Sequence, residues 1–205
     1  MSWSFEAGLN THLMVTTQAC EKIYKSSGGV AANTVTLKAD QGARLAWLPQ
    51  ESIVFDRAGF SRNITADLAQ DAEALFLEPI ILGRRSMGES VETANLRDRW
   101  RISQNGQLIH AEDFCLTGEI AAILPQLAIT GGQTAFATLL FVSPSAEGFL
   151  DDARQLIGPN GGVSCWNGKL LARVMAEDSF QLRKILLPLV TLMNFRADLP
   201  KVWSL

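Results

Sequence analysis

The chain is poor in the residues on which many enzymes and secreted proteins depend. Its 205 residues include two histidines, one tyrosine and three cysteines. A catalytic zinc usually needs three protein ligands, so His12 and His110 would need help from carboxylates or thiols. Cys20, Cys115 and Cys165 are odd in number and widely spaced, so they imply no disulfide framework and favour a reducing, cytoplasmic setting. We expect Cys20 and Cys115 to be small buried apolar residues.

Long apolar runs and a large excess of one charge are also missing. The longest apolar stretch, near residues 186–193, contains Pro188 and is too short to cross a bilayer. The first six residues have neither a basic nor a long apolar segment, so no signal peptide is expected. The formal charge of −3 offers no basic surface for nucleic acid. Neither a membrane nor a nucleic acid is therefore an expected partner.

The short motifs of common enzyme classes are absent as well. Residues 162–166 fail the nucleophile-elbow pattern at their last position, and Gly168-Lys169 lacks the rest of a phosphate-binding loop. Glu112 and Asp113 are adjacent carboxylates, but neighbours on a strand point to opposite faces. The sequence therefore offers no catalytic residues.

What the chain does have is strand periodicity over its first two thirds. Apolar and polar residues alternate along residues 60–68 and 95–102, as in half-buried strands. Asp98 breaks the second pattern, because it stands on the apolar side. Asn105-Gly106 then predicts a tight hairpin with a returning strand over residues 108–114. These patterns indicate a mostly β fold.

A weak repeat is superimposed on these strands. Short acidic or amide-rich turns lead into apolar strands near Gly8, Gly42 and Ala72, at intervals of 34 and 30 residues. Stacked units of this kind form a β-solenoid or a two-layer β structure. All-β proteins also alternate turns and strands at such intervals, so a chance match is the alternative.

The last third changes to helical periodicity. Ser143-Pro144 has the composition of a helix start, which predicts a helix over residues 144–157. Asp178 begins a capping pattern for a second helix over residues 179–194, in which Pro188 predicts a kink or a break. The overall prediction is a stacked two-layer or solenoid-like β architecture with two α-helices in the C-terminal third.

Four stretches along the chain combine unusual residues in a fixed order. They are Thr16-Thr17-Gln18-Ala19-Cys20-Glu21-Lys22-Ile23-Tyr24-Lys25-Ser26, Trp47-Leu48-Pro49-Gln50-Glu51, Leu82-Gly83-Arg84-Arg85-Ser86-Met87-Gly88-Glu89 and Leu199-Pro200-Lys201-Val202-Trp203. In composition and order they resemble motifs of the urease accessory protein UreD (UreH) family. The resemblance implies a single UreD-like domain over residues 1–205, with the family's stacked β fold and two helices.

This resemblance carries expectations about function. Family members have a further N-terminal portion without a counterpart here, so we expect the chain to be truncated relative to the family. The resemblance implies a non-enzymatic chaperone and scaffold in a complex with the accessory proteins UreF and UreG. That complex would bind apo-urease and pass nickel to its active site. The chain would need no cofactor of its own, since nickel is the transported ion.

The family's proposed nickel route is an internal, water-filled passage, and the sequence offers residues for it. Carboxylates and hydroxyls within apolar strands suit a conduit that holds a hydrated cation weakly. Glu78 is the most suggestive, because an ionised carboxylate in so apolar a run needs a partner or water. Its alternative roles are an ion pair with Arg84 or Arg85, or an exposed edge. The candidate passage residues are Thr16, Thr17, Glu51, Asp56, Glu78 and Glu112.

The remaining motif residues are expected to serve shape or partner contact. Because proline cannot donate to a ladder, Pro49 predicts a bend between two short strands. Gly83 and Gly88 flank a loop in which Glu89 is expected to clamp Arg84. The residues in this group are Lys22, Tyr24, Trp47, Pro49, Gln50, Gly83, Arg84, Gly88, Glu89 and Trp203.

Two other classes of function stay open. A carbohydrate-active enzyme on a β-solenoid would use Glu51, Glu78 or Asp98 as paired carboxylates. A chain with one tyrosine offers little of the aromatic-lined cleft that sugars require. The other class is a plain structural β module within a larger assembly. Binding to UreF-like or urease proteins would separate the maturation role from both.

Overall fold

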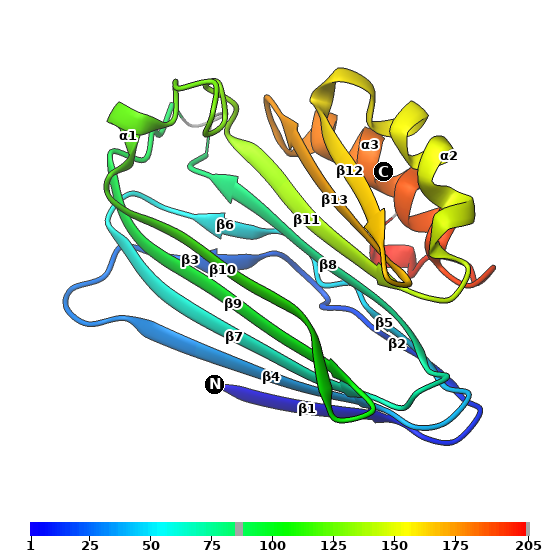
Figure 1. The fold of residues 1–205 in the computed structure, drawn as a ribbon. Coiled ribbons are helices and arrows are strands. Elements are labelled where there is room, and N and C mark those ends of the chain that lie inside the picture. The colour runs from blue at the N-terminus through cyan, green and yellow to red at the C-terminus, as the bar shows by residue number, and fades with distance from the viewer. Residues whose placement is uncertain (85–87, 204–205) are drawn as a thin grey trace.

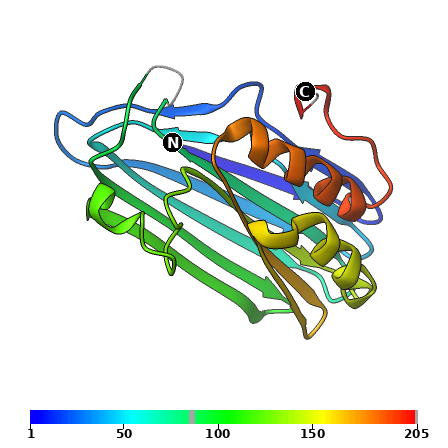
Figure 2. The same ribbon diagram turned by 90° about the horizontal axis from the view of Figure 1, so that it is seen from above.

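The computed structural model describes residues 1–84 and 88–203, which form three layers. Two β-sheets face each other, and two helices cover the outer face of the second sheet (Figure 1). Seen from above, these helices run side by side across that sheet (Figure 2). Residues 85–87 and 204–205 lie outside the described part of the chain.

The first sheet contains five of the described strands, in the order β1, β4, β7, β9 and β10. Neighbours are parallel except β9 and β10, which form the hairpin predicted at Asn105-Gly106. Both turn residues have positive φ, 50° and 74°, as a tight hairpin of this type requires. β10 extends beyond the predicted residues 108–114. The strands are β1 (Ser2–Ala7), β4 (Ala31–Ala39), β7 (Ala58–Leu68), β9 (Thr93–Gln104) and β10 (Gln107–Glu119).

The second sheet is built around β8, with β11, β13 and β12 on one side of it. On its other side, two short strands pair in line with the two halves of β8: first β5, then β6. β2 and β3 pair in turn with β5 and β6. Pro49 lies between β5 and β6, so the predicted proline break is confirmed. The strands are β2 (His12–Val15), β3 (Glu21–Ile23), β5 (Arg44–Trp47), β6 (Ser52–Val54), β8 (Glu73–Leu82), β11 (Ala135–Val142), β12 (Gly161–Trp166) and β13 (Lys169–Ala176).

From β1 to β9 the chain alternates between the two sheets, so that successive passes stack like the coils of a solenoid. Ser2 pairs with Thr34, Thr34 with Asn63, and Asn63 with Arg99, so each coil adds between 29 and 36 residues. The weak repeat in the sequence therefore reflects stacked coils, and the predicted solenoid-like β architecture is confirmed.

α2 (Leu150–Ile157) and α3 (Ser179–Met193) are the two helices that the sequence predicts. α2 begins later than expected. The Ser143 hydroxyl donates to Glu73 and accepts the Ser145 amide at 3.1 Å, and a turn follows it before the helix. A 3₁₀ turn over Ala146–Phe149 precedes it. The structure adds a single helical turn, α1 (Ile120–Ile123), and two 3₁₀ turns, η3 (Gly158–Asn160) and η4 (Lys201–Trp203).

The sequence predicts a kink or a break at Pro188, and α3 continues through this residue without a break. Asp178 caps its start as predicted, since Oδ1 accepts the Gln181 amide proton at 2.8 Å. The apolar side of the helix is fully buried against the second sheet. Packing therefore outweighs the one backbone hydrogen bond that proline removes.

Three apolar cores hold the layers together. One lies between the second sheet and the helices and includes Phe141 and Trp203. The other two fill the space between the sheets, one around Phe76 and Trp100 and the other around Phe60. Polar and charged side chains separate these two inner cores. They form part of the candidate site described below.

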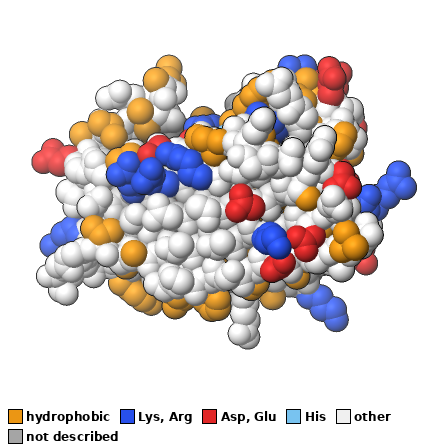
Figure 3. All heavy atoms as spheres, turned by 60° about the horizontal axis from the view of Figure 1, so that its bottom comes forward, with side chains coloured by type: hydrophobic (Ala, Val, Ile, Leu, Met, Phe, Trp, Pro, Cys, Tyr) orange, Lys and Arg blue, Asp and Glu red, His pale blue; other side chains and the backbone are white. Residues whose placement is uncertain are grey.

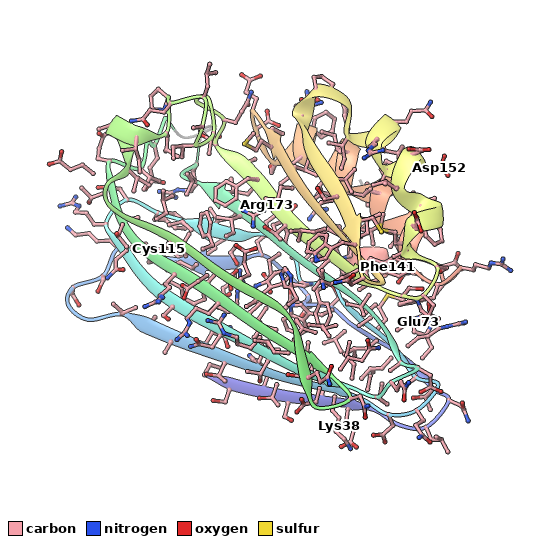
Figure 4. The ribbon with its side chains drawn as sticks, viewed as in Figure 1. Lys38, Glu73, Cys115, Phe141, Asp152 and Arg173 are labelled. Carbon is pink, nitrogen blue, oxygen red and sulfur yellow. The ribbon has the colours of Figure 1, made fainter. Side chains whose placement is uncertain are left out.

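The outer face of the first sheet is flat and mostly polar (Figure 3). Arg97, Arg99 and Arg101 gather there around the Asp113 carboxylate, which accepts two hydrogen bonds from Arg97 at 3.0 Å. Cys115 lies on β10, the strand that carries Asp113 (Figure 4). Its side chain is exposed, so the expectation of a buried thiol is wrong for Cys115. It shares the outward-facing parity of Asp113, which the strand period imposes.

Candidate functional site

A level of polar side chains crosses the interior between the two inner cores. Asn33, Arg62 and Asp98 occupy matching positions on β4, β7 and β9. Each belongs to the inward-facing set of its strand, and all three are buried. Glu78 faces them from β8 and is equally buried. Stacking of the coils therefore aligns residues that are about 30 positions apart into one charged layer.

Arg62 is the centre of this layer. Its guanidinium lies 2.6 Å from Glu78 Oε2 and 2.7 Å from Asp98 Oδ2. Two indoles hold the other carboxylate oxygens: Trp47 Nε1 donates to Glu78 at 2.7 Å, and Trp100 Nε1 donates to Asp98 at 3.1 Å. The side chains of the three charged residues are at most 5% exposed. Asp98, the exception in the strand pattern, is thus explained by its pairing with Arg62.

The electrostatics of the layer favour a protonated Glu78 at neutral pH. Burial raises the pKa of Glu78 to about 8, helped by the Asp98 charge and opposed by Arg62 and Trp47. Burial alone would lower the pKa of Arg62, but Asp98 and Glu78 outweigh it and hold that pKa above its usual value. Arg62 therefore stays charged, and Glu78 is the carboxyl that exchanges a proton near physiological pH.

A pocket of about 370 Å³, which we call the inner pocket, opens beside this layer. Trp3, Phe5 and Trp47 form its apolar walls, and Glu21 adds a third carboxylate. Four buried polar atoms of its lining have no hydrogen-bond partner within the described protein. They are Thr16 Oγ1, Asn33 Oδ1, Gln50 Nε2 and Arg62 Nε. The pocket is thus an apolar shell with unsatisfied polar groups, which suits water or a hydrated solute.

A second pocket of about 620 Å³, the outer pocket, lies on the helix side of the second sheet. Cys20, Glu51 and Arg183 line it. Arg183 Nε donates to Glu51 Oε1 at 2.5 Å, and the Cys20 thiol donates to Glu51 Oε2 at 3.3 Å. Burial pushes the pKa of Glu51 up, but the hydrogen bonds and charge of Arg183, a backbone hydrogen bond and the Cys20 thiol together hold the pKa below its usual value. Burial and the neighbouring carboxylate raise the pKa of the Cys20 thiol.

The structure places the candidate passage residues in several different locations. Thr16 and Thr17 line the inner pocket, and the Thr17 hydroxyl accepts the Gln50 amide at 2.9 Å. Glu78 lies in the charged layer, whereas Glu51 points to the outer pocket on the other face of the sheet.

Two candidates do not reach either pocket. Asp56 Oδ1 accepts the backbone amides of Glu92 and Thr93 at 2.9 and 3.0 Å, so it organises a loop. Glu112 pairs with Arg173 at 2.5 Å (Figure 4). Both residues have apolar neighbours in the sequence, but Asp56 lies in a loop and Glu112 on the edge strand β10. In such places a carboxylate finds partners outside the interior.

The partner predicted for Glu78 is also different. Arg62 takes this place, while Arg84 pairs with Glu89 at 2.7 Å, as the expected clamp. Arg85, the other predicted partner, lies outside the described residues. The sequence analysis did not identify Arg62 as the partner. The signal was the strand alternation, which places Arg62 on the same buried face of β7 as Phe60 and Ile64.

The other motif residues serve local structure. Tyr24 stacks on Phe55 with ring centroids 4.8 Å apart, and the Arg84 guanidinium lies 4.6 Å from the same ring. Trp203 Nε1 donates to the Leu48 carbonyl at 3.1 Å, which ties the C-terminal turn to the proline break. Lys22 is exposed on β3.

Glycines 83 and 88 shape the loop that follows β8. Gly83 has φ of 75°, and a Cβ there would lie 2.7 Å from the Glu89 carbonyl oxygen. Gly88 also has positive φ, at 69°. The expected role of both in loop shape therefore has a steric basis.

Of the carboxylates considered for a glycosidase, Glu51 and Glu78 lie on different faces of the second sheet. Glu78 and Asp98 are both held in ion pairs with Arg62. No group of three or more His, Cys, Asp or Glu side chains within residues 1–84 and 88–203 is arranged to hold a metal ion. The described helices include none long and apolar enough to span a membrane.

The fold and the site define a solenoid-like β scaffold with a charged interior, and comparison with known proteins names the family. The family model described as UreD urease accessory protein matches residues 1–204. The chain therefore belongs to the UreD family of urease accessory proteins, as the sequence motifs predicted. Membership of this family supports a role in urease maturation.

Curated relatives agree with this assignment. The chain is 50% identical over 206 residues to the urease accessory protein UreD of Rhizobium leguminosarum bv. viciae, covering 100% of this chain and 76% of that protein. It is 48% identical over 205 residues to the UreD protein of Agrobacterium fabrum, covering 72% of that protein. For the UreD protein of Mesorhizobium japonicum the identity is 49% over 209 residues, with 75% covered. These relatives are longer than this chain, as the resemblance led us to expect.

Proposed function

We propose that this chain is a non-catalytic scaffold for urease maturation that conducts nickel through its charged interior. In this role it binds apo-urease together with the accessory proteins UreF and UreG in the cytoplasm. The cargo is a hydrated nickel ion, which the chain holds only in transit. Family membership supports the maturation role, and the interior supports the path of the ion.

The observation that carries the proposal is the charge of the interior. Glu21, Glu78 and Asp98 against Arg62 give the inner pocket and the charged layer a formal charge of −2 when every group is ionised. That is the charge which one divalent cation neutralises. Because Glu78 holds a proton near neutral pH, an entering cation displaces this proton. The exchange of one positive charge for another keeps the electrostatic cost of entry small.

The donor set favours passage over storage. Nickel accepts carboxylate oxygens, but Arg62 and two indoles already hold the carboxylates of Glu78 and Asp98. An ion in the inner pocket therefore keeps much of its water and leaves again, as conduction requires. A closed cage of ligands would retain the ion instead.

The substitution Glu78→Gln tests the path. Glutamine copies the protonated carboxyl and can still accept from Trp47, but it has no proton to exchange for a cation. We expect the variant to bind UreF, UreG and apo-urease like the parent chain and to deliver several-fold less nickel. Binding is measured by pull-down, and nickel by metal analysis of the purified urease.

The matched control is Asp113→Asn, which removes an exposed carboxylate on the outer face of the first sheet. Unchanged nickel delivery by the Glu78→Gln protein would end the proposal for the interior path. Failure of the parent chain to bind either urease or UreF would end the scaffold proposal as a whole.

A further inference from the structure

The backbone ladder of the second sheet is interrupted next to Pro49. The Leu48 amide still donates to the Val15 carbonyl at 2.8 Å, and pairing resumes where the Glu21 amide donates to Glu51 at 2.9 Å. Between these points Pro49 has no N–H, and the Gln50 amide donates to a side chain, the Thr17 hydroxyl. In the described part of the chain, the segments 16–20 and 49–50 are therefore not joined by backbone hydrogen bonds.

The two pockets meet on opposite sides of this interruption. Gln50 and Ser52 line the inner pocket, whereas Glu51 and Ile53 line the outer pocket. This alternation is what an extended chain imposes, because successive side chains point to opposite faces. The pockets are thus separated by one strand's thickness, at the place where that strand lacks its ladder.

A single side chain bridges the two sides. Arg183 projects from α3 into the outer pocket, where its guanidinium donates to both oxygens of Glu51 at 2.5 and 2.8 Å. It also donates to Gln50 Oε1, although Gln50 lines the inner pocket. Gln50 is 5% exposed, and its Nε2 atom has no partner in the described protein.

We propose that the interruption at Pro49 is an opening through the second sheet between the inner and outer pockets, and that the Arg183 guanidinium is the plug that closes it. The proposal rests on the function proposed above, because it names one mouth of the cation path. A fixed guanidinium fills the gap and repels a divalent cation, so the ion crosses when Arg183 turns away from Gln50 and Glu51.

The groups that Arg183 leaves behind suit a cation in transit. The Glu51 carboxylate and the Gln50 amide oxygen are oxygen ligands, which bind nickel less tightly than thiolates do. The Cys20 thiol lies next to them and donates to Glu51 Oε2 at 3.3 Å. Once Arg183 turns away, the opening therefore presents two oxygen ligands that hold a hydrated cation weakly.

Blocking the outer pocket provides the first test. In a chain with Cys115→Ser and Cys165→Ser, Cys20 is alkylated with N-ethylmaleimide, the reagent is removed, and apo-urease, UreF, UreG and Ni²⁺ are added. We expect nickel delivery to fall by about tenfold or more, because the added group occupies the pocket. The control is the same treatment of a chain that also carries Cys20→Ser, which should deliver nickel normally. Full delivery by the alkylated chain, with binding of its partners intact, would overturn the opening.

Replacing the plug provides the second test and decides the matter where alkylation disturbs binding. Arg183→Gln keeps a donor for Glu51 but removes the charge and shortens the side chain. We expect the initial rate of nickel delivery at limiting Ni²⁺ to rise several-fold. The matched control is Lys184→Gln, which removes the same charge from an exposed neighbour on α3 and should leave the rate unchanged. Equal rates for the two variants, or a slower Arg183→Gln protein, would show that Arg183 is only a clamp between α3 and the sheet.

The outcomes separate this proposal from the proposed function. If Glu78→Gln lowers nickel delivery while alkylation of Cys20 and Arg183→Gln do not change it, the interior path stands and this opening is rejected. If Glu78→Gln leaves nickel delivery unchanged, the interior path itself falls.

Discussion

Glu78 shows how a buried carboxyl can be costly for stability and still titrate near neutral pH. An ionised carboxylate in an apolar interior is unfavourable unless it is paired and hydrogen-bonded. Arg62 and Trp47 supply a pair and a donor, yet the pKa of Glu78 still rises to about 8. The residue therefore remains near its point of titration under physiological conditions, which a fully compensated carboxylate would not do.

The first prediction follows from this pKa. Because the pKa of Glu78 is higher in the folded than in the unfolded chain, its contribution to stability is fully present below about pH 4 and is lost as pH rises through about 8. We expect Glu78→Gln to remove this loss, so that its free energy of unfolding varies less between pH 5 and 9. The difference should be on the order of 2–4 kcal/mol across this window, measured by urea unfolding at a series of pH values.

The control for this measurement is Glu6→Gln, whose carboxylate pairs with Lys38 on the exposed surface. Its stability profile should follow that of the parent chain. Parallel profiles for Glu78→Gln and the parent would mean that Glu78 is ionised in the folded protein throughout this range.

At the scale of elements, α3 links the helical layer to the proline break. Its apolar side packs on the second sheet, and a partly buried ion pair joins it to Glu51 through Arg183. The position of Arg183 depends on where the helix begins, because one residue of helix turns the side chain by about 100°. The cap at Asp178 is therefore a positioning feature as well as a source of stability.

The second prediction concerns this cap. Asp178→Ala removes the acceptor of the Gln181 amide and should cost about 1 kcal/mol, which lowers Tm by about 2–4 °C for a chain of this size. Asp152→Ala is the matched control, because Asp152 is exposed in the first turn of α2 (Figure 4) and no side-chain cap bond is found there. Calorimetry of the two variants compares them directly. Equal Tm losses would show that the charge near a helix start matters and the capping bond does not.

At the scale of the whole molecule, the solenoid presents an edge strand on the side of the inner pocket. β1 pairs with β4 on one side, and its other side has no partner strand among the described residues. Trp3 on this strand is 47% exposed although it lines the inner pocket. An edge with exposed apolar groups is a template for association.

The third prediction is that this edge makes the isolated chain self-associate. Trp3→Lys places a charge on the edge and should weaken association by about tenfold, since burial of part of an indole is worth roughly 1–2 kcal/mol. Sedimentation velocity at several concentrations measures the effect. Leu156→Lys is the control, because Leu156 is similarly apolar and exposed but lies on α2. If both variants associate like the parent chain, the edge is not the contact.

The sequence alone determined those parts of the fold that depend on local geometry. Alternating polarity gave the strands, Asn105-Gly106 the hairpin, Pro49 the broken strand, and Asp178 the start of α3. Each of these signals acts over a few residues, through backbone dihedrals and single hydrogen bonds. The spacing of the turns also indicated the stacked coils, because a solenoid repeats its local pattern.

Only the tertiary structure decided which charges meet. Arg62 lies 36 residues from Asp98, and Arg183 lies 132 residues from Glu51, so no local rule links them. The sequence predicted Arg84 or Arg85 as the ion-pair partner of Glu78, because both are close to Glu78 along the chain. Contact between ionic groups depends instead on which coils stack and which layer covers them. For that reason the charged layer and the interrupted ladder beside Pro49 became visible only once the chain was folded.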